Sequence, residues 1–368
     1  MLPKIAILGA SGFVGRRLLE WFHLTNSAEL RPIVRNYSSL ASLSRFDLDW
    51  RIADACDEVA LAAAFSGCDY VVNLIAANPD IIVRNAAISY RASETAFVKR
   101  MVFMSSASVH GQAPSPGTNE ASLLHTSHVF PYNNAKVIAE RKLFGLRNSG
   151  SVELSILRPG IVYGPRSRWI RDVADQLLSD TAYLVDGGMG ICNSIYVDNL
   201  IHAIELAIAS PAADRNVFLV GDLERVTWLD FYKIIASSLG LDMSRVESIK
   251  PIIYHHGFSD RFNQLRVSKP LQAILPYVPT PVKAALKAGI KSFTAQSNPS
   301  PWAFNEIQQY QVSEEFNALH QCSVQLPSHK AHSLLGFQPP IPFLEGMRRS
   351  CAWLHFAGYS ILPQHSPS

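Results

Sequence analysis

The sequence is poor in cysteine and in long apolar runs. It contains five cysteines and no C-x-x-C pair: Cys56, Cys68, Cys192, Cys322 and Cys351. Their odd number and wide spacing argue against a disulfide scaffold or a zinc site, and they favour a reducing compartment. No stretch of about 18 apolar residues is present, so the sequence predicts no membrane-spanning helix.

The sequence also lacks an excess of charge of either sign. Lys and Arg total 33 against 30 Asp and Glu, and a formal net charge of +3 gives no strong field for nucleic acid. The short apolar run Ile5–Leu8 is shorter than a secretory signal requires, so we expect a cytoplasmic protein. Apolar residues make up 48% of the chain, which supports a sizeable core and argues against disorder.

Short apolar segments alternate with helix-like segments through the first half of the chain. The predicted strands are Lys4–Leu8, Leu30–Val34, Tyr70–Ile75, Met101–Ser105 and Leu154–Arg158. The predicted helices are Phe13–His23, Val59–Phe65, Ser89–Lys99 and Asn134–Leu146. This alternation predicts an α/β fold with a doubly wound parallel sheet and right-handed crossovers.

The second half is less regular. Helices are predicted at Arg168–Leu178, Leu200–Ala209 and Thr227–Leu239, and strands at Ser194–Val197 and Val217–Val220. From Lys250 onward prolines and polar residues interrupt the pattern. We therefore expect a smaller and less regular region after the parallel sheet.

A glycine-rich turn follows the first predicted strand. Its sequence fits G-x-x-G-x-x-G and opens a helix, which is typical of a Rossmann-type dinucleotide site. The glycines allow a tight turn and a close approach of the backbone to a pyrophosphate, which the helix N-terminus then binds. The predicted cofactor-binding residues are Gly9, Ser11, Gly12, Phe13, Val14 and Gly15. The alternative is a glycine-rich turn in another kind of α/β protein.

The end of the second predicted strand bears on the choice of cofactor. An acid there would bind the ribose 2′-hydroxyl of NAD, but this position is Arg35, and no acid lies between Arg31 and Arg45. Since a guanidinium suits a 2′-phosphate, the sequence favours NADP over NAD. A solvated surface arginine is the alternative. Asp54 stands where it could contact adenine, and an ordinary loop or cap aspartate is the alternative for that residue.

Three residues form a candidate catalytic set. Tyr132 and Lys136 are four residues apart at the start of a predicted helix, which places them on one face. A nearby ammonium and an oxidised nicotinamide both favour the phenolate, which can then exchange a proton with a substrate hydroxyl. Ser106 follows a predicted strand, at the edge of the sheet where ligands gather, and can hydrogen-bond the reacting oxygen.

With these motifs the sequence resembles an extended short-chain dehydrogenase/reductase of the NAD-dependent epimerase/dehydratase family. The segments that carry the resemblance run in order over nearly the whole chain: Gly9–Gly15, Asn73–Ala77, Ser105–Gly111, Tyr132 with Lys136, Leu157–Pro165, Tyr196–Asn199 and Leu335–Phe337. The resemblance implies an NAD(P)-dependent enzyme with Ser106, Tyr132 and Lys136 as its catalytic set. It also implies that Ala76, Ala77, Pro159 and Ile161 line the cofactor site.

The resemblance also implies a domain organisation. We expect an NAD(P)-binding Rossmann domain at residues 1–165, to which 194–221 return. Residues 166–352 would form most of a smaller, interleaved substrate domain, and 353–368 a tail. A homodimer is left open.

Two departures from the family pattern bear on the substrate. His110 stands where such sequences often have tyrosine, and we interpret it as a structural replacement. The segment Gly190–Ser194 lacks the arginine that binds the diphosphate in many sugar-nucleotide epimerases. Arg166, Arg168 and Arg171 could supply that positive charge from another direction, with a solvated helix face as the alternative.

Three functions remain open on the sequence. The first is an epimerase or oxidoreductase of a nucleotide-linked sugar. The second is a 3β-hydroxysteroid-type dehydrogenase or reductase of a bulky apolar alcohol. The third is a non-catalytic NADP-binding regulator. Residues Thr280–Phe293 predict an amphipathic helix with lysines on one stripe, which is either a packed lid or a membrane-surface helix.

Overall fold

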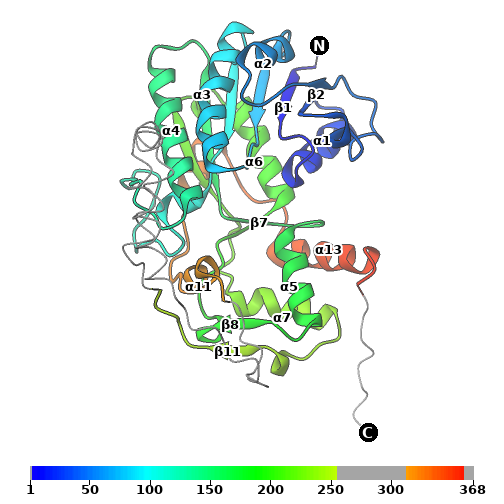
Figure 1. Cartoon of the computed structure of the whole chain (residues 1–368), viewed down its shortest axis with the longest axis vertical. Coiled ribbons are helices and arrows are strands. Elements are labelled where there is room, and N and C mark those ends of the chain that lie inside the picture. Colours follow the sequence, from blue (N-terminus) through cyan, green and yellow to red (C-terminus); the bar gives the residue numbers. More distant parts are fainter. Residues whose placement is uncertain (1, 255–311, 360–368) are drawn as a thin grey trace, which may run out of the picture. The chain divides into compact units, whose positions relative to one another are not determined.

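The computed structural model describes residues 2–254 and 312–359 (Figure 1). The chain divides into a larger unit, Met1–Lys250 with Glu315–Ser368, and a smaller unit, Pro251–Glu314. Within the described part of the smaller unit, the Tyr254 hydroxyl donates to the carbonyl of Val312 at 2.5 Å. The predicted helix at Thr280–Phe293 lies outside the described residues. Among the residues that are described, no helix combines the length and the apolar character needed to cross a bilayer.

A seven-stranded parallel sheet forms the centre of the larger unit. Its strand order is β10-β6-β5-β4-β1-β2-β3, and every neighbouring pair is parallel. The strands are β1 Lys4–Leu8, β2 Glu29–Val34, β3 Arg51–Ile52, β4 Tyr70–Asn73, β5 Arg100–Met104, β6 Glu153–Pro159 and β10 Asn216–Val220. This confirms the predicted doubly wound sheet. The strand order reverses between β1 and β4, the point where open α/β sheets bind ligands.

Helices cover both faces of this sheet. Their bounds are α1 Phe13–Thr25, α2 Glu58–Phe65, α3 Pro79–Thr95, α4 Pro131–Ser149 and α6 Val197–Ala209. Apolar residues of α2, α3 and α4 join one buried cluster and those of α1 and α6 join another. The two clusters therefore fill the two layers between the sheet and its helices.

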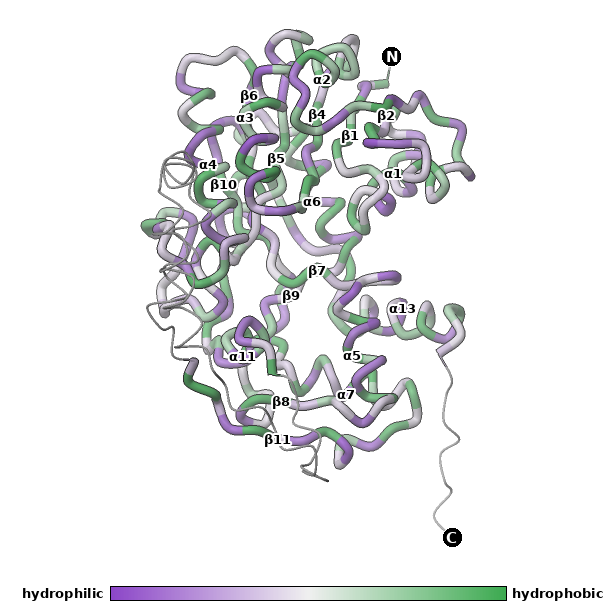
Figure 2. The backbone as a smooth tube through the Cα atoms, in the orientation of Figure 1, coloured by the Kyte–Doolittle hydropathy of each residue, from purple (hydrophilic) through white to green (hydrophobic). Residues whose placement is uncertain are grey.

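Alternation along the strands explains why both layers form. In β1, Ile5 and Ile7 belong to the cluster under α1, while Ala6 and Leu8 belong to the cluster under α3. Successive side chains of a strand point to opposite faces, so a strand that is apolar at every position must be covered on both. Apolar residues also predominate in β4 and β5, although these strands include Asn73 and Arg100 (Figure 2).

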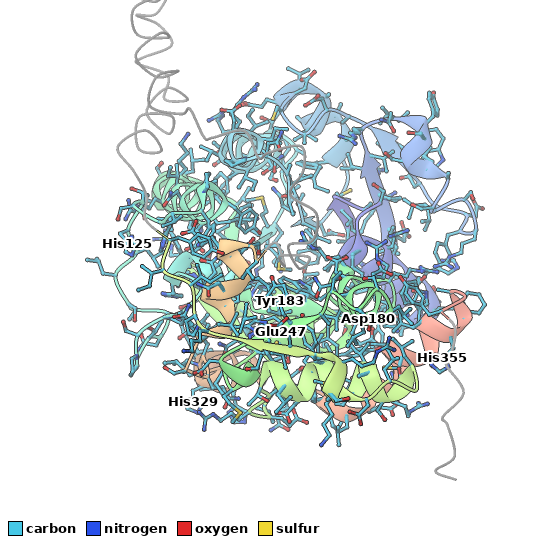
Figure 3. The ribbon with its side chains drawn as sticks, turned by 60° about the horizontal axis from the view of Figure 1, so that its bottom comes forward. His125, Asp180, Tyr183, Glu247, His329 and His355 are labelled. Carbon is cyan, nitrogen blue, oxygen red and sulfur yellow. The ribbon has the colours of Figure 1, made fainter. Side chains whose placement is uncertain are left out.

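The remaining elements of the larger unit form a second, less regular region. They are β7 Ile161–Tyr163, α5 Arg168–Leu178, β8 Tyr183–Val185, β9 Ser194–Tyr196, α7 Trp228–Ser238, β11 Glu247–Ile249, α11 Glu314–His320, α12 His329–Leu335 and α13 Phe343–Phe356. Strand β7 pairs with β9 and lies between the large sheet and α5 and α7 (Figure 1). Strand β8 pairs with β11, where Tyr183 faces Glu247 (Figure 3).

Five short 3₁₀ helices occur among the described residues, and one of them bears on the site. They are η1 Tyr37–Leu40, η2 Ala107–His110, η3 Asp186–Gly188, η4 Pro211–Ala213 and η5 Met243–Arg245. The loop after β5 forms η2, which begins directly after Ser106.

The structure corrects several element boundaries. The third helix was predicted at Ser89–Lys99, but α3 begins ten residues earlier, at Pro79, because proline is favoured at the first helical position. Strand β9 does not join the large sheet; it pairs with β7. Helix α13 continues through Phe356, past the expected end of the second domain at residue 352, and its Leu354 is fully buried.

Candidate active site

The glycine-rich turn joins β1 to α1 in the conformation that the motif predicts. Gly9 has a φ of +78°, a backbone conformation that residues with a side chain rarely adopt. A Cβ on Gly15 would collide with the Gly9 carbonyl and with the backbone of Ala10, so only glycine lets the helix pack this closely. The first N–H groups of a helix have no partner within it. The chain therefore offers the N-terminus of α1, which begins at Phe13, to an anion.

The fold brings Ser106, Tyr132 and Lys136 together. Ser106 directly follows Ser105 at the carboxyl end of β5, and its Oγ accepts from the backbone N–H of Ser108 at 3.1 Å. Tyr132 lies in the first turn of α4, and Lys136 lies one turn later. The Lys136 ammonium nitrogen is 5.7 Å from the centre of the Tyr132 ring. The carboxyl end of β5 and the first two turns of α4 thus position the three side chains.

The Lys136 side chain is fully buried. Its Nζ donates to the carbonyls of Met104 at 2.7 Å and Ile75 at 3.2 Å, which lie at the ends of β5 and just past β4. Burial lowers the pKa of Lys136 to about 7, and the charge of Glu140 acts in the opposite direction. The position of this ammonium is therefore fixed by two strand ends.

Tyr132 is a neutral phenol in the cofactor-free protein. Burial and, to a smaller extent, the negative charge of Glu315 raise its pKa to about 12, while its hydrogen bond with Ser106 acts in the other direction. The neutral Tyr132 phenol is therefore able to donate its proton to an alkoxide. Proton abstraction from an alcohol requires added positive charge next to the ring.

A closed ion pair lies beneath Lys136. Arg158 and Glu140 are 3% and 2% exposed, and they form two hydrogen bonds, of 3.0 and 2.6 Å. Ser105 also donates to Glu140, and Arg158 contacts Nε2 of His110 at 3.1 Å. Burial and the Arg158 charge lower the pKa of His110 to about 4, so the ring is neutral and accepts from Arg158. This packing agrees with a structural role for His110.

Ser106 and Tyr132 open into a cavity of about 690 Å³, a volume typical of small-molecule sites. The cavity extends from the glycine-rich turn to α5 and α11. Its lining includes Phe13, Ala76, Pro159 and Ile161, four of the residues predicted to hold the cofactor. Ala77, a fifth, follows Ala76 and is exposed to solvent.

Four arginines line this cavity: Arg16, Arg166, Arg168 and Arg171. We call them the arginine wall. Arg16 belongs to α1, Arg168 and Arg171 belong to α5, and Arg166 lies in the turn between β7 and α5. Arg166 has a φ of +73°, a strained conformation for a residue with a side chain, of the kind that clusters at functional sites.

Positive charge is in excess around Arg16. Burial, Arg166 and Arg45 all lower the pKa of Arg16. Arg45 and Arg166 both pair with the single carboxylate of Glu20, the latter at 3.3 Å. Arg16 Nε is buried and has no hydrogen-bond partner among the described residues. An anion in the cavity would relieve this crowding of like charges.

A carboxylate lies on the Tyr132 side of the same cavity. Glu315, from α11, accepts from Gln112 Nε2 at 3.4 Å, and Gln112 Oε1 accepts from Asn133 Nδ2 at 2.8 Å. Gln112, Asn133 and Glu315 were not predicted from the sequence. No local signal could have found them, because 203 residues separate Gln112 from Glu315. Arg16 was also missed, although it directly follows the glycine motif.

The remaining predicted cofactor residues lie at the ends of β2 and β3. Arg35 directly follows β2, is exposed, and makes no hydrogen bond or ion pair within residues 2–254 and 312–359. Asp54 is exposed too, and its carboxylate accepts from the N–H of Cys56 at 2.7 Å. That hydrogen bond gives Asp54 a local turn-forming role. In the part of the chain that the structure describes, no group of His, Cys, Asp and Glu could hold a metal ion.

The fold and the glycine-rich turn define the class of protein. A parallel sheet of this order, a G-x-x-G-x-x-G turn and a Ser, Tyr and Lys set together characterise extended short-chain dehydrogenase/reductases, which are NAD(P)-dependent enzymes. The model of the "NAD dependent epimerase/dehydratase family" matches residues 5–221. The chain belongs to this family.

Known relatives include enzymes of sugar and of sterol chemistry. An N-acetyl-alpha-D-glucosaminyl-diphospho-ditrans,octacis-undecaprenol 4-epimerase of Escherichia coli O157:H7 is 29% identical over 59% of this chain and 67% of its own. A decarboxylating sterol-4-alpha-carboxylate 3-dehydrogenase of Dictyostelium discoideum is 21% identical over 68% of this chain and 80% of its own.

A solved structure shares the fold over nearly the whole chain. It is a dTDP-glucose 4,6-dehydratase of Streptomyces venezuelae with NAD bound, with a TM-score of 0.69. The two sequences are 17% identical, and the match covers 96% of this chain and 97% of the other. This likeness supports the fold and not the substrate.

Proposed function

We propose that the protein transfers hydride between NAD(P) and a carbinol of a nucleotide-linked sugar, as an epimerase or an oxidoreductase. The observation that carries the proposal is the arginine wall, because it lines the same cavity as Ser106 and Tyr132. A diphosphate bears the charge that such a wall would bind through charge-assisted hydrogen bonds. The curated epimerase relative also acts, by its name, on a diphospho-linked sugar.

We propose Ser106, Tyr132 and Lys136 as the catalytic set. Tyr132 would exchange a proton with the substrate hydroxyl, and Ser106 would hydrogen-bond the same oxygen. Lys136 would hold positive charge next to the phenol, at a point fixed by the carbonyls of Met104 and Ile75. The bound cofactor supplies the hydride acceptor or donor. The close turn at Gly9–Gly15 and the helix N-terminus fit its pyrophosphate.

We further propose that NADP is preferred over NAD. Arg35 supports this, because it is exposed at the end of β2 and has no carboxylate partner among the described residues. Asp54 remains a proposed adenine contact. Titration of the protein with each dinucleotide tests the preference, and equal or tighter binding of NAD would show it to be wrong.

The domain boundaries, location and assembly are proposals as well. Residues 1–165 with 194–221 would form the cofactor domain and 166–352 most of the substrate domain; of the tail expected at 353–368, the residues up to Phe356 belong to α13. The return of β10 to the large sheet supports the interleaving. We propose a cytoplasmic protein, and a homodimer is a second proposal that light scattering coupled to size-exclusion chromatography would test.

Ligand binding tests the proposed substrate class. We would measure the melting temperature of the protein saturated with NADP, with UDP-glucose, UDP or glucose added. A ligand at 100 times its Kd stabilises the native state by about 2.7 kcal/mol. We expect UDP-glucose and UDP to raise the melting temperature and glucose to have little effect, because the arginine wall would bind the diphosphate. A rise with none of a set of nucleotide sugars would contradict the proposal.

The sterol dehydrogenase relative favours a second candidate, oxidation of a bulky apolar alcohol. The cavity argues against it, since an apolar ring system would displace water from four arginines and Glu315 and offer them no hydrogen bonds in return. A 3β-hydroxysteroid added to the same assay separates the two candidates. If the steroid raised the melting temperature and nucleotide sugars did not, the second candidate would replace the first.

A further inference from the structure

The cavity carries opposite charges on two sides. The arginine wall comes from α1, α5 and the turn before α5, whereas Glu315 comes from α11. Glu315 acts electrostatically on Tyr132, raising the pKa of the phenol, and Arg166 acts on Arg16. The negative charge is therefore associated with the proposed reacting end of the cavity. The positive charge of the arginine wall is on the side of the cavity formed by α1 and α5.

The Glu315 carboxylate is held in place by a chain of side chains. Asn133, fully buried and next to Tyr132 in the sequence, donates to Gln112 Oε1 at 2.8 Å. Gln112, 8% exposed, donates from Nε2 to Glu315 Oε1 at 3.4 Å. Two buried amides thus connect the helix that carries Tyr132 to the carboxylate. Such a link restricts Glu315 to the neighbourhood of the phenol.

We propose that Glu315 is a specificity-determining residue: it selects substrates whose reacting end is neutral or cationic and excludes those with a carboxylate beside the reacting carbinol. This inference rests on the proposed function. Sugar hydroxyls or an ammonium group would donate to Glu315, because an ionised carboxylate only accepts hydrogen bonds. Glu315 is exposed to solvent, so a substrate carboxylate beside it would meet a like charge that water partly screens, and the contact remains unfavourable.

UDP-glucose and UDP-glucuronate form a matched pair of probes. They differ in one group, a hydroxymethyl in the first and a carboxylate in the second, attached to the ring carbon next to the 4-carbinol. Both carry the diphosphate that the arginine wall would bind. The difference between their affinities therefore reports on the reacting end, and their common affinity reports on the proposed function.

We would measure both dissociation constants by calorimetry, with the NADP-saturated Tyr132→Phe protein, in which we expect turnover to be about 10²–10⁴-fold slower. Because Glu315 is exposed and its charge is partly screened, we expect glucuronate to bind about two- to fivefold more weakly than UDP-glucose. Glu315→Gln should remove most of that difference by tightening glucuronate binding. Glu315→Asp, which keeps the charge, should retain discrimination. Glu247→Gln, which removes one exposed carboxylate on β11, should change neither constant.

Each outcome decides between the two proposals. Discrimination that falls in Glu315→Gln and persists in Glu315→Asp and Glu247→Gln supports the inference. Equal binding of the two probes by the parent protein, or discrimination unchanged in Glu315→Gln, overturns it and leaves the proposed function standing. If neither probe binds, the proposed function fails, and the inference that rests on it fails as well.

Discussion

Two groups of arginines near the candidate site differ in how the fold neutralises them. Arg158 is almost completely buried and is matched by one carboxylate, Glu140, through two hydrogen bonds. In the arginine wall, Arg166 shares Glu20 with Arg45, and the pKa of Arg16 is lowered by its neighbours. The charge of Arg158 is thus neutralised within the protein. The arginine wall has more positive charges than nearby carboxylates, which is the expected state of a site that binds an anion.

This comparison separates arginines that stabilise the fold from arginines that bind a ligand. Removing a partner from a satisfied buried pair leaves an uncompensated charge in the core, so stability is lost. Removing one member of a crowded set relieves repulsion, so stability is kept while ligand affinity falls. Position in the sequence does not make this distinction, since Arg158 and Arg166 are only eight residues apart.

The largest expected effect comes from opening the buried pair. Arg158→Met should lower the free energy of unfolding by about 3–5 kcal/mol, because Glu140 would remain charged and buried. Urea denaturation measures this. The double variant Arg158→Met/Glu140→Leu should recover part of the loss, since it removes the unpaired carboxylate, although Lys136 then loses the nearby charge of Glu140. A loss below about 1 kcal/mol in the single variant, the size found for exposed pairs, would contradict the description of this pair as closed.

The arginine wall should respond in the opposite way. Arg166→Gln should weaken UDP-glucose binding by about 10–100-fold, because a hydrogen bond to a charged group contributes about 1.5–3 kcal/mol. Its free energy of unfolding should stay close to that of the parent protein. Arg348→Gln is the control, since Arg348 is exposed on α13 outside the cavity lining. A large loss of stability in Arg166→Gln would remove the contrast between the two groups.

Lys136 gives the next effect, a pH dependence of stability. Burial lowers its folded pKa to about 7, below the unfolded value of 10.5, so between these values the unfolded chain binds more protons. The free energy of unfolding of the cofactor-free protein should therefore rise with pH through this window, by up to about 1.4 kcal/mol per pH unit. Below pH 7 this contribution is constant.

Lys136→Met is the control for that measurement. Tyrosines and cysteines away from Lys136 also titrate at alkaline pH, but they contribute equally to both proteins. Tyr132, whose pKa is about 12, stays protonated in the folded parent protein up to pH 10, so the difference between the two stability curves reports mainly on Lys136. The account predicts that the parent protein gains stability relative to the variant from pH 7 to pH 10. Parallel curves would mean that the ammonium is not desolvated as the structure indicates.

Arg35 should show the smallest effect, because it is exposed. Arg35→Ala should weaken NADP binding by about fivefold, the upper end for exposed charge pairs, and leave NAD binding unchanged. Fluorescence titration with each dinucleotide measures both. A fall in NAD affinity as large as the fall in NADP affinity would assign Arg35 to some contact other than the 2′-phosphate.

Local signals allowed much of the site to be predicted from the sequence. The glycine-rich turn and the Tyr132–Lys136 spacing each lie within a few residues. The structure shows the turn where it was expected, and it shows the helix beginning three residues before the predicted Asn134, at Pro131. The start of α3 was missed because Pro79 follows irregular residues at the end of β4, and a proline there was not recognised as the first helical residue.

Contacts between distant segments could not be predicted from the sequence. The ion pair between Arg158 and Glu140 was not predicted, because it joins β6 to α4. Gln112 and Glu315 meet only once α11 is placed against the loop after η2. The charges proposed to decide specificity therefore come together only in the folded chain, whereas the proposed catalytic motif can be recognised in the sequence.

Tyr132→Phe is the most direct test of the central claim that this cavity performs hydride chemistry on an alcohol. It removes one hydroxyl and keeps the ring, so folding and NADP binding should persist. Turnover, followed by nicotinamide absorbance with UDP-glucose or another nucleotide sugar that the binding screen identifies, should fall by about 10²–10⁴-fold, the usual contribution of a general acid or base. A variant that kept more than about half of the parent rate would contradict the assignment of Tyr132.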